Sequence, residues 1–139
     1  MRRRSAGLWI LSLALAVGCG SSTSDASIKR HLLRGVAQIR TTRDPAELHA
    51  KLVRTLASLR RDHASTAAAR RARRLAIEGF EATLKGVRSR LDFIENDSGN
   101  VAAATRDARR ADRYLARGAD RLRAAGAALG LRLGRLTAY

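Results

Sequence analysis

Apolar residues recur at steps of three and four along most of this chain, and this spacing restricts its fold more than any other feature. Such a repeat places apolar side chains on one face of an α-helix. Alternating runs of strand-forming residues are sparse, and the only proline is Pro45. Because 139 residues make one domain at most, the sequence predicts a single all-α unit. We expect an antiparallel bundle of three to four long helices over residues 28–139.

The first predicted helix starts after a cap at Asp25 or Ser27 and ends near Thr41. The apolar residues that share one of its faces are Ile28, Leu32, Leu33, Val36 and Ile39. The next helix is expected to open at Asp44 and Pro45, because aspartate caps a helix and proline suits its first turn.

Residues 46–94 follow one heptad-like register, which is apolar at both ends and polar in the middle. Two interpretations are open: one long helix whose buried face shifts, or two helices broken near residues 61–66. Since neither glycine nor proline interrupts residues 46–78, the one-helix interpretation is favoured.

The strongest stop signal is the cluster of Asn, Asp, Ser and Gly at residues 95–100. The helix after it has mostly small residues on its apolar face, which are Val101, Ala104, Ala108, Ala111, Leu115, Gly118, Leu122, Ala125 and Leu129. A face of small residues lets a neighbouring helix approach closely. We therefore expect this helix to pack antiparallel on residues 77–94.

The carboxyl-terminal tail admits two patterns. Glycines at steps of four, from Gly126 to Gly134, would form one smooth face of a helix. Leucines also alternate with other residues from Leu129 to Leu133, which is a strand-like period. We favour a helix that continues to about residue 136, because it would lie on the helices already predicted.

The chain is strongly basic, with 28 Lys and Arg against 12 Asp and Glu and a net charge of +16. A field of this sign attracts anionic partners. The densest basic stretch is expected to bind anionic lipids, wall polymers or an acidic protein, and its residues are Arg60, Arg61, Arg70, Arg71, Arg73 and Arg74. The alternative is a solvated helix face without a ligand. Nucleic acid is disfavoured as the partner, because no aromatic residues interleave these charges.

The amino terminus has the pattern of an export signal. Three arginines precede an uncharged apolar stretch, residues 6–18, which is shorter than the roughly 20 residues of a membrane span. The end of this stretch resembles the lipobox of bacterial lipoproteins, and the residues at the matching positions are Leu15, Ala16, Val17, Gly18 and Cys19.

This resemblance implies that a signal peptide, residues 1–18, is removed and that Cys19 is lipidated. A diacylglycerol adds two acyl chains, which is what stable anchoring requires. Residues 19–27 are expected to form a flexible tether, because serines and small residues dominate them after the cysteine. The protein would then be held at the extracytoplasmic face of the cell membrane. As the only cysteine of the chain, Cys19 has no partner for an intramolecular disulfide.

The residues form no pattern that is typical of catalysis or of a metal site. The three histidines have no acidic partner at ligand spacing, and His49 and His63 would lie about 21 Å apart along one helix. His31 stands alone on the first helix. No serine stands in a known nucleophile motif, and no glycine-rich phosphate loop follows a strand. We expect a protein that is not an enzyme and that holds no metal ion or cofactor.

The expected function is that of a non-enzymatic structural or interaction module of the cell envelope. One alternative is a small-ligand-binding lipoprotein whose apolar pocket would be formed by Phe80, Leu84, Leu115 and Tyr114. Another is a cytoplasmic nucleic-acid binder, in case the amino terminus is not an export signal. The oligomeric state stays open, because the heptad runs could pair between chains.

Overall fold

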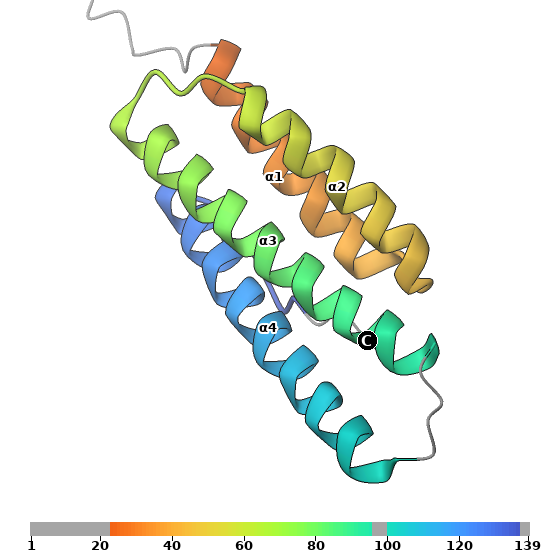
Figure 1. Cartoon of the computed structure of the whole chain (residues 1–139). Coiled ribbons are helices and arrows are strands. Elements are labelled where there is room, and N and C mark those ends of the chain that lie inside the picture. The colour runs from red at the N-terminus through yellow and green to blue at the C-terminus, as the bar shows by residue number, and fades with distance from the viewer. Residues whose placement is uncertain (1–22, 96–99, 137–139) are drawn as a thin grey trace, which may run out of the picture.

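The computed structural model describes residues 23–95 and 100–136 (Figure 1). Within these ranges it contains four α-helices and no strand, so the predicted all-α fold is confirmed. The helices are α1 (Thr23–Thr41), α2 (Pro45–Arg61), α3 (Ala67–Glu95) and α4 (Val101–Ala128). The predicted signal peptide and Cys19 lie outside the described residues.

The helices form two hairpins, α1–α2 and α3–α4, which pack together mainly through α2 and α3 (Figure 1). The interface between α3 and α4 is the most extensive in the bundle. Gly79 of α3 lies against Leu122 of α4, whereas Gly86 lies against Leu115, so the two helices are antiparallel. A Cβ atom at Gly118 would lie 3.0 Å from the Gly79 carbonyl oxygen. The close antiparallel packing predicted from the small residues of the last helix is therefore confirmed.

The core lies between the two hairpins. Phe80 of α3 is fully buried and packs against Gly35 of α1, where any Cβ atom would collide with the aromatic ring. The apolar face predicted for the first helix is buried except at Leu33, which is 41% exposed. The other large side chains that are fully buried are Ile28, Leu32, Leu48, Leu52, Leu59, Leu122, Val36 and Val87.

The favoured prediction of one helix over residues 45–95 is wrong, because the chain breaks between α2 and α3. Asp62 ends α2 in an extended conformation while its N–H still donates to the Ser58 carbonyl. The Thr66 hydroxyl accepts from the Ala69 N–H at 3.1 Å and so caps the start of α3. Polar side chains therefore end one helix and start the next without a glycine or a proline.

Helix α1 begins at Thr23, inside the segment that was predicted to be a tether. Its first turn is held by the break between α2 and α3. The Asp25 carboxylate accepts from the Ser65 N–H at 2.9 Å and from the Thr66 hydroxyl at 2.7 Å. Asp25 thus joins two elements, and the predicted helix start, after Asp25 or Ser27, is too late.

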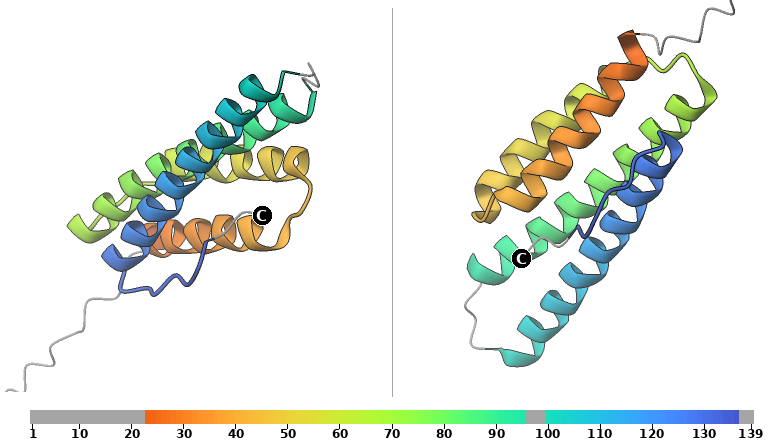
Figure 2. Two further views of the ribbon diagram at one scale, coloured as in Figure 1. Left: turned by 90° about the horizontal axis from the view of Figure 1, so that it is seen from below. Right: turned by 180° about the vertical axis from the view of Figure 1, so that it is seen from behind.

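Helix α4 ends at Ala128, so the favoured prediction of a helix to about residue 136 is wrong. Gly130 has a φ of +69°, and the Leu131 N–H donates to the Gly126 carbonyl at 2.9 Å. This is a Schellman motif, which needs a residue in the left-handed conformation that glycine adopts at no steric cost. The chain then runs back along the bundle between α1 and α4 (Figure 2). The leucines of this segment that pack on the core are Leu131, Leu133 and Leu136.

The far end of the α3–α4 hairpin extends beyond the α1–α2 hairpin (Figure 1). Its apolar side chains are consequently open to solvent, with Ile94 63% and Val101 77% exposed. The apolar face predicted for the last helix is therefore buried or half-buried from Ala111 onward, whereas its residues in the first turns of α4 are exposed or half-buried.

Candidate anion-binding surface

The arginines of the predicted anion-binding stretch lie at the end of the bundle where α1 begins (Figure 1). The break between α2 and α3 divides them between the last turn of one helix and the first turns of the next. They are Arg60, Arg61, Arg70, Arg71, Arg73 and Arg74.

Half of this set binds groups of the protein itself. The Arg73 guanidinium donates to the carbonyls of Leu59 and Arg60, at 2.8 and 2.6 Å, and so satisfies the carboxyl-terminal end of α2. Arg70 donates to the Ser65 carbonyl at 2.8 Å. Arg60 is ion-paired with Glu81 at 2.7 Å. These contacts give the three arginines roles in the fold.

The other half is available to a ligand. Arg61, Arg71 and Arg74 are exposed, and within residues 23–95 and 100–136 their guanidinium groups have no hydrogen-bond or ion-pair partner. Arg61 also lines a groove.

This groove lies between α1 and α2 and has a volume of about 390 Å³. Three arginines surround it: Arg34 of α1, and Arg54 and Arg61 of α2. None of the three guanidinium groups is paired with a carboxylate in the described part of the chain. The rest of the groove is lined by Gln38, Thr55, Ala57 and Ser58.

The polar side chains of the groove favour a ligand that accepts hydrogen bonds. The buried Thr55 hydroxyl donates to the side-chain amide oxygen Oε1 of Gln38 at 2.9 Å, which leaves the NH₂ group of the Gln38 side chain to donate elsewhere. The Ser58 hydroxyl donates to the Arg54 carbonyl at 3.2 Å. Guanidinium and amide N–H groups are therefore the donors that the groove offers, and they suit an oxyanion.

Sequence reasoning missed Arg34 and Arg54, although a short internal repeat could have indicated them. Residues 31–41 and 51–61 match in apolar pattern and at two arginine positions, while Arg61 corresponds to Thr41. The hairpin sets these like segments antiparallel, so an approximate two-fold axis relates α1 to α2. Arg34 and Arg54 are equivalent under it, and both line the groove, one from each helix. The identical pairs are Leu32 and Leu52, Arg34 and Arg54, Ala37 and Ala57, and Arg40 and Arg60.

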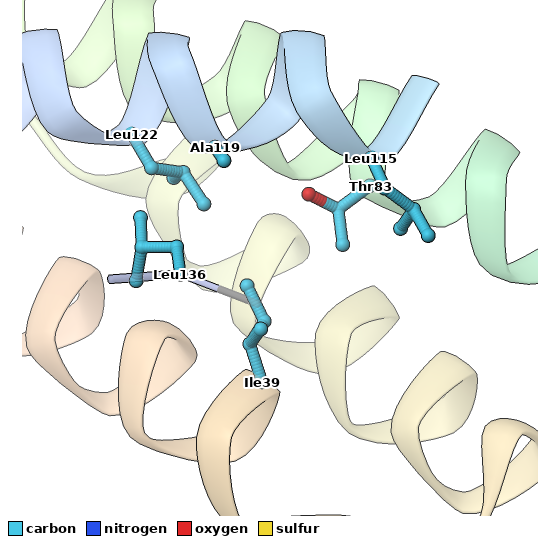
Figure 3. A pocket seen from close by; sticks show the side chains of 6 residues that line it. All are labelled: Ile39, Thr83, Leu115, Ala119, Leu122 and Leu136. Carbon is cyan, nitrogen blue, oxygen red and sulfur yellow. The ribbon is translucent and has the colours of Figure 1, made fainter. Parts of the chain in front are cut away.

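The four residues proposed for an apolar ligand pocket do not all line one cavity. Phe80 is buried in the core, and Leu115 lines a void of about 10 Å³, which is room for one water at most (Figure 3). Leu84 and Tyr114 line a wide open groove of about 380 Å³. The rim of that groove is basic and includes His49, Lys85, Arg88 and Arg110.

His31 and His49 lie in different parts of the bundle. His31 contacts Asp62 at 2.7 Å through its Nδ1 atom, as part of the junction between α1 and the end of α2. His49 lies on the basic rim described above. In the described ranges, no three His, Cys, Asp or Glu side chains come together in a way that could hold a metal ion.

No helix in the described part of the chain is both long and apolar enough to cross a membrane. Comparisons with protein-family models, with curated proteins and with solved structures find no match to this chain.

Proposed function

We propose that this chain is a lipid-anchored, non-enzymatic protein of the bacterial cell envelope that binds an anionic partner through arginines of α1, α2 and the start of α3. The proposal rests on two features. The lipobox-like residues 15–19 supply the anchor. The observation that carries the binding function is the groove where Arg34, Arg54 and Arg61 meet without a carboxylate.

Charge pairing elsewhere on the surface supports this choice of site. Several basic residues far from the groove have an acidic partner, as in the pairs of Arg88 with Asp92 at 2.9 Å and Arg121 with Glu78 at 3.4 Å. The acids of the chain are too few to pair all its arginines, so a surplus of positive charge remains. A bound anion would relieve the mutual repulsion of the three groove arginines.

The position of α1 relative to the proposed anchor also supports the proposal. Because α1 begins at Thr23, the chain from Cys19 spans at most about 14 Å before the bundle starts. The exposed arginines Arg61, Arg71 and Arg74 lie at this same end of the bundle. Anchoring would therefore hold a basic surface close to the lipid headgroups, where anionic lipids attract it.

Vesicle binding tests the anion-binding part of the proposal. The full chain carries Cys19→Ala, and Arg2, Arg3 and Arg4 are changed to glutamine so that arginines of the leader do not bind the vesicles. It is mixed with phosphatidylglycerol vesicles and, in parallel, with phosphatidylcholine vesicles, which report the binding by the apolar residues 6–18. We expect stronger retention on the anionic vesicles and a loss of that excess as salt is raised, because salt screens the arginines. Equal retention on both vesicles at low salt would contradict an anionic partner.

A further inference from the structure

We infer that the groove between α1 and α2 is a phosphate-binding site in which Arg34 and Arg54 hold one phosphate group from opposite sides. The inference rests on the proposed function, since both need an anionic ligand, but it is narrower. It names the ligand chemistry and the residues that recognise it.

The two-fold relation between α1 and α2 favours phosphate over carboxylate. A guanidinium presents parallel N–H donors that match a pair of oxygen atoms. A carboxylate has one such pair and would satisfy one arginine. A tetrahedral phosphate can present one oxygen pair to Arg34 and another to Arg54, which line the same groove from equivalent positions of the repeat.

Further donors of the groove add to this match. The hydrogen bond from Thr55 to the Oε1 atom of Gln38 orients the side-chain amide, so its NH₂ group is positioned before a ligand binds. Arg61 stands where the first copy of the repeat has Thr41. It therefore adds a third positive charge at one end of the groove only, which suits a ligand that carries more than one negative charge.

The fold itself does not account for these arginines. Arg73 shows what a structural arginine does in this bundle, since it binds the last carbonyls of α2. The guanidinium groups of Arg34 and Arg54 make no such contact within the described residues, and both side chains are exposed. Exposed arginines are ordinary, but two equivalent ones that converge on one groove, with a third beside them, form a recognition site.

The test compares two double variants that remove equal charge. The groove variant carries Arg34→Gln and Arg54→Gln and so lacks the two arginines that are proposed to bind phosphate. The control variant carries Arg71→Gln and Arg74→Gln and so lacks two exposed arginines outside the groove. All chains carry Cys19→Ala. Calorimetry with inorganic phosphate should show an affinity loss of about tenfold or more for the groove variant, and less than about twofold for the control.

A third variant separates recognition from charge. This variant carries Arg34→Lys and Arg54→Lys, which keep the net charge but remove the parallel N–H donors of both guanidinium groups. We therefore expect it to bind phosphate nearly as weakly as the variant with glutamine at both positions. Because all of these side chains are exposed, we expect helical circular dichroism and the unfolding midpoint to match those of the parent chain.

Phosphatidylglycerol vesicles then identify the source of the phosphate. A loss of vesicle binding confined to the groove variant would assign the site to a lipid headgroup. Equal vesicle binding by the groove and control variants, with phosphate affinity lost only in the groove variant, would assign it to a soluble phosphate.

Equal loss of phosphate affinity in the groove and control variants would overturn the inference and leave the proposed anionic partner standing. Absence of phosphate binding in the parent chain, together with retained binding to anionic vesicles, would do the same. Absence of binding to either probe would overturn the inference and the proposed anionic partner together.

Discussion

Among the single residues of the bundle, Asp25 makes the contact that joins the first turn of α1 to the start of α3. Its carboxylate accepts from the N–H and the hydroxyl of Ser65, both at 2.9 Å, and from the hydroxyl of Thr66 at 2.7 Å. The hydroxyl of Thr66 and the N–H of Ser65 lower the pKa of Asp25 from 3.8 to about 2, while desolvation opposes them. The ionised carboxylate is therefore the form that the fold favours.

This shift predicts an acid-sensitive contribution to stability. Because the pKa of Asp25 is lower in the folded state, its contribution is fully present above about pH 4 and is lost as the pH falls toward 2. We expect Asp25→Asn to be less stable than the parent chain above pH 4, with the difference shrinking below it. Urea unfolding between pH 2 and pH 7 measures this difference. A difference that stays constant over that range would show that the carboxylate is not favoured by folding.

At the level of elements, the packing of α3 on α4 depends on glycines that let the two backbones approach. A Cβ atom at Gly118 would lie 3.0 Å from the Gly79 carbonyl oxygen and 3.1 Å from the Thr83 backbone nitrogen. These are backbone atoms, so they cannot turn aside as the end of a side chain can. A larger residue at this position must push the helices apart.

Gly118→Ala is therefore expected to destabilise the bundle by about 1–3 kcal/mol, although alanine favours an isolated helix by about 1 kcal/mol. Gly134→Ala is the control, because a Cβ atom there would meet only the Arg40 side chain, at an ordinary 3.5 Å. Chemical unfolding of both variants measures the difference. A Gly118→Ala variant as stable as the parent chain would contradict the close packing of these helices.

The helical periodicity was enough to predict an all-α chain and the stop after α3, since both are encoded by neighbouring residues. The break between α2 and α3 was not predictable in the same way. One of its determinants, Asp25, lies on α1, far away in the sequence. The tail was mispredicted because the spacing of its glycines also fits one face of a continuing helix. Gly130 instead ends the helix, and the alternating leucines pack on the core in an extended segment.

At the scale of the whole molecule, the density of arginine along the sequence was only a partial guide to the candidate site. It drew attention to Arg73, which the fold uses as a helix cap. It did not indicate Arg34 and Arg54, because each lies in a stretch with few other arginines, and the two line one groove only when α1 and α2 pack together. Their equivalence could be read from the repeat, but their convergence on one groove required the tertiary structure.

The arginine-bearing bundle is proposed to be held by a lipid anchor at Cys19, and intact-mass analysis with membrane fractionation tests that proposal most directly. The parent chain should lose residues 1–18, gain the mass of a lipid and sediment with membranes, whereas Cys19→Ala should gain no lipid mass. A parent chain that keeps residues 1–18, carries no lipid and stays in the soluble cytosolic fraction would contradict the account.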